Sequence, residues 1–84
     1  MDVENEIRNF IVENFLFGNR EKLPADDDSF LQKGLIDSTG ILEVISFIEE
    51  RFGISVEDNE LVPENLDSIR CLADFIVRKQ GLQV

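Results

Sequence analysis

The chain has 84 residues and a formal net charge of −10, since 18 residues are Asp or Glu and only 8 are Lys or Arg; it has one cysteine and no His, Trp or Tyr. This length predicts a single domain over residues 1–84, and the charge argues against nucleic acid or an anionic membrane as a partner and favours basic partners. Without histidine, Ser–His–Asp and Cys–His catalysis are excluded, so we expect a protein that is not an enzyme.

The N-terminal residues do not resemble a secretory signal. They are acidic where a secretory signal is basic and then apolar. No apolar run reaches the roughly 20 residues that span a bilayer, and a lone cysteine cannot form an internal disulfide. We therefore expect a cytoplasmic protein without a membrane segment.

The first helix is predicted between Asp2, a plausible N-cap, and Gly18, a typical C-terminal residue. Its apolar side chains recur at helical spacing and define a core face: Val3, Ile7, Phe10, Ile11 and Phe17. Asn14 interrupts this face, and we interpret it as a polar residue that bonds a nearby loop.

A long loop is predicted over residues 19–36, which contain Pro24 and Gly34 and show no clear period. Several apolar side chains are expected to hold this loop against the core: Leu23, Phe30, Leu31, Leu35 and Ile36. The acidic run 26–28 resembles the start of a calcium-binding EF-hand, but that register puts Phe30 at a ligand position and Leu31 at the obligatory glycine. We expect no metal site.

The second helix is predicted from about Ser38 to Phe52, with Gly53 just past its end. The expected core face consists of Ile41, Leu42, Ile45, Ile48 and Phe52. The opposite face carries Glu43, Ser46, Glu50 and Arg51. Phe47 falls on this outer face between acids, which suggests either a docking residue or a ring that packs beneath a loop.

The start of this helix carries a serine, in the turn formed by residues 34–40. The unpaired backbone N–H groups and the dipole at the start of a helix favour an attached phosphate. Ser38 is therefore the first candidate for the functional atom.

Residues 54–65 are predicted to be irregular, with one short helical turn at 58–62, because Pro63 opposes a long helix. The last helix is expected to begin after Asp67 or Ser68, to carry Arg78 and Lys79 near its end, and to stop at Gly81. Its predicted core face is Ile69, Leu72, Ala73, Ile76 and Val77.

Cys71 lies off the core face of the last helix and is expected to be an ordinary, partly exposed thiol. Taken together, the segments predict an all-α fold without strands. It is a small four-helix bundle with three main helices, one short helix and a long loop between the first two helices.

The sequence resembles the acyl carrier protein family over essentially its whole length. The matching segments are residues 34–38, the end of the acidic helix at 49–53, the turn at 56–58 and the final helix. The resemblance implies that 4′-phosphopantetheine from coenzyme A is attached to Ser38 and that its thiol carries an acyl or aminoacyl group as a thioester. Thr39 offers a second hydroxyl, but the family register selects Ser38.

We expect partner recognition at the turn and along the second helix. The expected recognition residues are Asp37, Thr39, Glu43, Val44, Phe47, Glu49 and Glu50. The implied partners are a phosphopantetheinyl transferase, an AMP-forming acyl or aminoacyl ligase and downstream acyl-processing enzymes, whose basic patches would meet these acids. We expect the carrier to be a monomer.

The residues after the serine indicate a specialised pathway. Housekeeping fatty-acid carriers usually have Leu and then an acid after this serine, whereas this chain has Thr39 and Gly40, and polar Ser46 stands at a position that is often apolar. With residues 63–69, this pattern resembles stand-alone carriers that are loaded by AMP-forming ligases. The alternatives are a housekeeping fatty-acid carrier, a D-alanyl carrier and, in another class, an acidic adaptor that binds a basic partner without a cofactor.

Overall fold

The computed structural model describes residues 3–82, so the N-cap expected at Asp2 lies outside the described residues. The elements follow in the order α1 (Val3–Phe15), η1 (Arg20–Lys22), α2 (Ser38–Phe52), η2 (Asp58–Glu60), α3 (Pro63–Leu66) and α4 (Ile69–Leu82), where η denotes a 3₁₀ turn. Residues 3–82 contain no strand, which confirms the predicted all-α bundle. No helix in this part of the chain has the length and hydrophobicity needed to cross a membrane.

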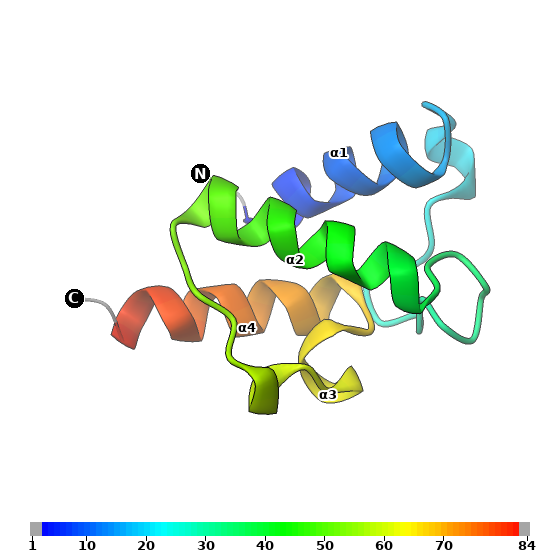
Figure 1. Cartoon of the computed structure of the whole chain (residues 1–84). Helices are drawn as coiled ribbons and strands as arrows, with labels where there is room; N and C mark the ends of the chain where they lie inside the picture. The colour runs from blue at the N-terminus through cyan, green and yellow to red at the C-terminus, as the bar shows by residue number, and fades with distance from the viewer. Residues whose placement is uncertain (1–2, 83–84) are drawn as a thin grey trace.

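Helix α4 contacts α1, α2 and α3 (Figure 1). The side chains that are less than 2% exposed come from three of the helices and from the long loop. The largest of them are Phe30, Ile7, Ile11, Ile36, Ile48, Ile69, Leu72, Ile76 and Val44. Full burial of one such side chain contributes about 1.5–3 kcal/mol, so each buried loop residue stabilises the bundle about as much as a buried helix residue does.

Helix α1 ends at Phe15, earlier than predicted. Just past the helix end, the N–H of Gly18 donates to the carbonyl of Val12, six residues earlier, at 2.8 Å. Phe17 adopts a left-handed conformation there, with φ 53°, and its side chain is 96% exposed. The prediction that Phe17 belongs to the core was therefore wrong, because the chain reverses before it; Leu16 is buried instead.

The polar interruption in α1 is explained within the helix itself. The side-chain nitrogen Nδ2 of Asn14 donates to the carbonyl of Phe10, one turn earlier, at 2.9 Å. Asn14 therefore does not bond a nearby loop through this amide, as the sequence suggested. The amide donates its hydrogen bond within its own helix instead.

The long loop between α1 and α2 packs largely as expected. Phe30 and Ile36 are buried, and Leu23 and Leu35 are half-buried. Leu31 is 51% exposed, so its assignment to the core was wrong. The loop also contains η1, which its sequence gave no reason to expect.

Ion pairs anchor the acidic run of this loop. Its carboxylates face separate cations: Asp26 with Arg8, Asp27 with Arg70, and Asp28 with Lys33. The hydrogen bond from Arg8 holds the pKa of Asp26 below its ordinary value of 3.8. Among the residues described, no group of three or more His, Cys, Asp or Glu could hold a metal ion.

Helix α2 has the predicted bounds, but a different face is buried. Its core residues are Gly40, Val44, Ile48 and Phe52, each four residues after the last. Leu42 is 61% exposed, and Ile41 and Ile45 are only half-buried, so the predicted core face was wrong in part. Periodicity alone did not show how the helix is rotated about its axis, because that depends on the elements packed against it.

The segment between α2 and α4 contains two short helical pieces. The predicted turn appears as η2. Helix α3 was not predicted, because proline opposes a helix at interior positions; here Pro63 is the first helical residue, where its missing N–H costs no hydrogen bond.

Helix α4 begins where the sequence predicted, and Ser68 provides the cap: its Oγ accepts a hydrogen bond from the N–H of Cys71 at 3.0 Å. Gly81 lies inside the helix, so it does not end it. Val77 is 56% exposed, so its assignment to the core face was wrong, whereas Phe75, which was not assigned to that face, is buried. Cys71 is half-buried, as expected.

Candidate functional site

Ser38 is the first residue of α2, and its side chain is exposed. Asp37 precedes it in an extended conformation, and its Oδ1 accepts a hydrogen bond from the N–H of Gly40 at 2.8 Å. This is the N-cap arrangement that starts a helix and satisfies one of its unpaired donors. The remaining N–H groups of the first turn and the helix dipole favour a negative charge beside the serine.

Gly40 allows this turn to lie close to the rest of the bundle. A Cβ at this position would lie 2.9 Å from Cγ2 of Ile36 and 3.0 Å from the ring carbon Cε1 of Phe15. Both distances are shorter than ordinary van der Waals contacts. The departure from the housekeeping pattern after Ser38 therefore has a structural reason: the glycine lets α2 start directly against the end of α1.

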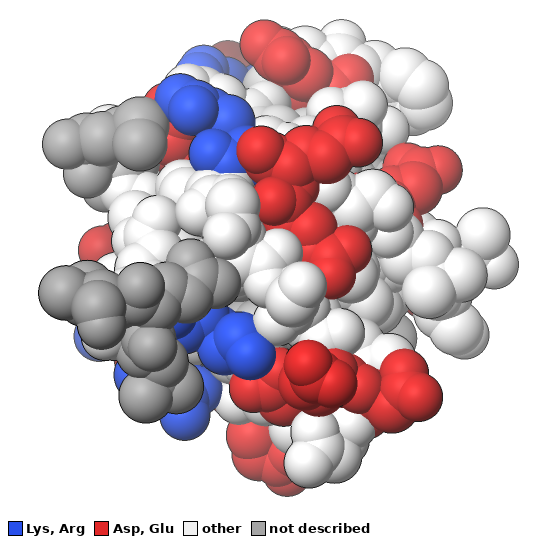
Figure 2. Space-filling model, turned by 60° about the vertical axis from the view of Figure 1, so that its left-hand side comes forward, with Lys and Arg blue, Asp and Glu red and all other residues white. Residues whose placement is uncertain are grey.

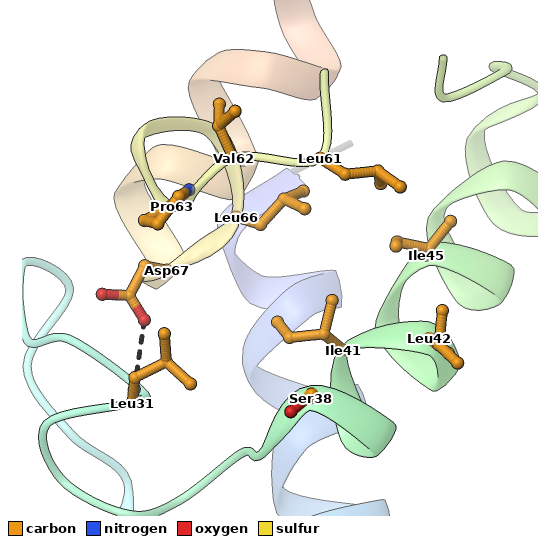
Figure 3. Close-up of a pocket in the computed structure, with 10 residues that line it drawn as sticks. All are labelled: Leu31, Ser38, Ile41, Leu42, Ile45, Leu61, Val62, Pro63, Leu66 and Asp67. Carbon is orange, nitrogen blue, oxygen red and sulfur yellow. Dashed lines mark hydrogen bonds between the residues drawn. The ribbon is translucent and has the colours of Figure 1, made fainter. Parts of the chain in front are cut away.

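A pocket of about 250 Å³ opens beside Ser38 (Figure 3). Helix α2 forms one wall and the segment from η2 to α3 forms the other; apart from Ser38, the lining residues are Leu31, Ile41, Leu42, Ile45, Leu61, Val62, Pro63, Leu66 and Asp67. Nearly all of these side chains are apolar. The pocket thus offers a group bonded to Ser38 a sheltered apolar surface.

Asp67 fixes the loop at the edge of this pocket. Its Oδ1 accepts from the N–H of Leu31 at 3.1 Å, its Oδ2 accepts from the hydroxyl of Ser29, and its carbonyl accepts from the N–H of Phe30 at 2.8 Å. The sequence suggested only a helix cap at Asp67. The spacing of residues in the sequence could not predict that Asp67 holds this loop, since its hydrogen-bond partners lie 36 to 38 residues away.

The structure separates the expected recognition residues by exposure. Asp37, Thr39, Glu43 and Glu50 are exposed. Val44 is 1% exposed and forms part of the core, so its assignment to partner recognition is corrected: a partner cannot reach its side chain in this conformation.

Glu49 and Phe47 have structural contacts of their own. Glu49 is half-buried, and its Oε2 accepts from the N–H of Val56 at 2.9 Å. The ring of Phe47 is also half-buried and stacks on Phe10, with 4.1 Å between ring centroids and 13° between planes. Phe47 therefore neither stands free nor packs beneath a loop; it packs against α1.

Among the charged side chains on the face shown in Figure 2, Asp and Glu cover more of the surface than Lys and Arg, which are limited to smaller patches at its left. The charge of −10 is thus displayed in broad acidic areas rather than balanced evenly over this face. Such a surface attracts basic partners and repels acidic ones.

Known proteins of similar sequence and fold are carrier proteins. A D-alanyl carrier protein from Streptococcus suis is 32% identical over 77 residues, which cover 92% of this chain and 94% of the relative. The solution structure of a holo acyl carrier protein from Nitrosomonas europaea superposes with a TM-score of 0.76 at 25% identity, over 96% of this chain and 99% of that one. The apo structure of KstB-PCP, a peptidyl carrier domain, gives a TM-score of 0.73 at 39% identity, over 89% and 82%. No family model matches the chain.

The chain belongs to the acyl carrier protein family. The predicted resemblance and carrier function are thereby confirmed. Members of this family bear a 4′-phosphopantetheine group, are generally not enzymes themselves, and interact with phosphopantetheinyl transferases and with ligases or synthetases. The exposed hydroxyl of Ser38, at the start of a capped helix and beside an apolar pocket, fits such a group.

Proposed function

We propose that Ser38 is the attachment site of 4′-phosphopantetheine and that the chain carries an acyl or aminoacyl group for a specialised pathway. The observation that carries this proposal is the exposed hydroxyl of Ser38 at the first residue of α2. The prosthetic group supplies a thiol that can hold cargo as a thioester. The protein's own residues hold the turn in place through Asp37 and favour the phosphodiester charge through the first-turn N–H groups.

The proposed partners are a phosphopantetheinyl transferase, an AMP-forming ligase and enzymes that process the cargo. Asp37, Glu43 and Glu50 are exposed and available to basic surfaces of these enzymes. Exposed charge pairs raise association rates more than affinity. Such contacts suit a monomeric cytoplasmic carrier that has no catalysis of its own and visits several enzymes in turn.

We propose an amino acid or a short acyl group as the cargo. The relative from Streptococcus suis is named a D-alanyl carrier protein, and KstB-PCP is a peptidyl carrier, so both support an aminoacyl cargo. The small apolar pocket beside Ser38 is consistent with a compact group. Routine fatty-acid elongation is the less favoured alternative.

The attachment site is tested by incubating the protein with coenzyme A and a broad-range phosphopantetheinyl transferase. Intact mass spectrometry should show one added arm on the wild type and on Thr39→Ala, and none on Ser38→Ala. An arm on Ser38→Ala would place the site elsewhere. A wild type that stays unmodified would instead favour the cofactor-free adaptor.

A further inference from the structure

One phenylalanine of the chain is not part of the core. Of the seven phenylalanines, six are buried or half-buried, whereas the side chain of Phe17 is 96% exposed. Both faces of its ring are therefore accessible to another molecule. Because apolar side chains stabilise a fold through the area that they bury, this ring contributes almost nothing to the bundle.

The backbone of Phe17 is strained as well. Its φ of 53° lies in the left-handed region, where a bulky side chain crowds the backbone and glycine is favoured. The next residue, Gly18, is also left-handed, with φ 85°. The reversal after α1 thus uses two left-handed residues, of which only one is a glycine. Strained residues of this kind concentrate at sites where they serve a function.

Hydrogen bonds hold the turn that carries the ring. The N–H of Gly18 donates to the carbonyl of Val12 at 2.8 Å, and the N–H of Asn19 donates to the carbonyl of Leu16 at 2.9 Å. The side-chain oxygen of Asn19 also accepts from the N–H of Glu21 at 3.1 Å and so starts η1. The ring is therefore presented from a defined position, and a partner that covers it orders little additional backbone.

The exposed ring lies at the same end of the bundle as the serine. Phe15, the last residue of α1, approaches the first turn of α2 so closely that a Cβ on Gly40 would lie 3.0 Å from its ring. Phe17 follows Phe15 by two residues and Ser38 precedes Gly40 by two, and two residues span at most about 7 Å of chain. Figure 1 shows the end of α1 and the start of α2 at this end of the bundle.

We propose that Phe17 is a docking residue for the phosphopantetheinyl transferase and that its ring enters an apolar pocket of that enzyme. The transferase must bring its active site to the hydroxyl of Ser38, so its surface covers this end of the bundle, whereas a ligase meets the thiol at the far end of the arm. Even a small interface buries about 600 Å² of each partner, a patch about 28 Å across that is wide enough to include both residues. The inference rests on the proposed function, since it assumes that the transferase acts on Ser38.

The test is the steady-state kinetics of arm attachment by the transferase of the same organism, at saturating coenzyme A and varied concentrations of the carrier. Phe17→Ala should raise the KM for the carrier about tenfold and leave kcat unchanged, because loss of an aromatic anchor weakens docking without altering the reacting groups. Phe17→Leu, which keeps an apolar side chain, should retain most of the affinity. The matched control is Val77→Ala, which removes a 56% exposed apolar side chain on α4 and should change neither constant.

Phe17→Gly separates docking from folding. Glycine accepts the left-handed conformation, so this variant should be at least as stable as the wild type and yet show the same rise in KM as Phe17→Ala. A KM that neither variant raises would overturn the proposal, as would a fall in kcat alone. Sedimentation of the wild type as a dimer that Phe17→Ala dissociates would also overturn it, because a second copy of the chain would then cover the ring.

The same reactions distinguish this proposal from the proposed function. One arm on Ser38 together with an unchanged KM for Phe17→Ala would contradict the docking proposal alone. An arm that still attaches to Ser38→Ala would contradict the proposed attachment site, whatever the KM values. A wild type that the transferase leaves unmodified would contradict both.

Discussion

The carboxylate of Asp37 accepts a hydrogen bond from the backbone N–H of Gly40, at 2.8 Å between Oδ1 and the nitrogen. Asp37 thus has a structural function that is separable from its charge. It closes the first turn of α2 and so fixes the two residues between them, Ser38 and Thr39. A side chain that keeps the hydrogen bond without the charge distinguishes these functions.

We expect Asp37→Ala to lower the free energy of unfolding by about 1 kcal/mol, because Ala cannot cap the helix, and Asp37→Asn to change it less, because Asn can. Both should slow attachment of the arm to Ser38 if the transferase recognises the charge. Urea unfolding and the initial rate of modification measure the two effects. A normal rate for Asp37→Asn would show that the transferase does not use the charge.

Gly40→Ala should destabilise the protein by about 1 kcal/mol, even though Ala favours helices, because overpacking outweighs the gain in helix propensity. The added methyl would press on Ile36 and on the Phe15 ring. Thermal unfolding measures the change, with Ser46→Ala on the exposed face as the control. An increase in stability would mean that the neighbouring side chains move aside at little cost.

Phe17→Gly should leave the fold intact and raise the free energy of unfolding by about 0.5–1 kcal/mol. Glycine removes the strain of the left-handed conformation, and this gain exceeds its entropic cost. The lost phenyl ring is 96% exposed, so little packing is lost with it. Phe17→Ala is the matched control, because it removes the ring and keeps the strain. Equal stability of the two variants would argue against strain at this residue.

Asp26→Asn tests the ion pair with Arg8. The hydrogen bond from Arg8 lowers the pKa of Asp26 in the folded state, so the pair stabilises the fold fully above the unfolded pKa, and this contribution is lost as the pH falls through the folded pKa. At pH 7 the variant should be less stable than the wild type by about 0.5–1 kcal/mol, since the pair is partly exposed. Urea unfolding at a series of pH values should show the difference disappearing below about pH 4. A difference that does not change with pH would contradict this origin.

Local chemistry explains what could be predicted from the sequence. The bounds of α2 follow from residues at its ends, and Gly53 ends the helix with φ 67°, a conformation that glycine adopts without strain. Ser68 was recognised as a possible cap of α4 for the same reason. Ser38 was found because its position at a helix start is visible in the sequence.

The features that were missed depend on tertiary contacts. The exposure of Leu42 and the burial of Val44 follow from the rotation of α2 against its neighbours. The contact of Phe47 with Phe10 joins two helices, and the bonds of Asp67 join segments more than 30 residues apart. No pattern within one segment contains this information, so the pocket beside Ser38 could not be predicted.

Leu42 lines both the pocket beside Ser38 and an open groove between α1 and α2. This side chain therefore lies between the two hollows. Under the proposed function, a partner that contacts α2 on the groove side would not enter the pocket beside Ser38, where the carried group would lie. One leucine would thus keep the exchange of partners independent of the protection of the cargo.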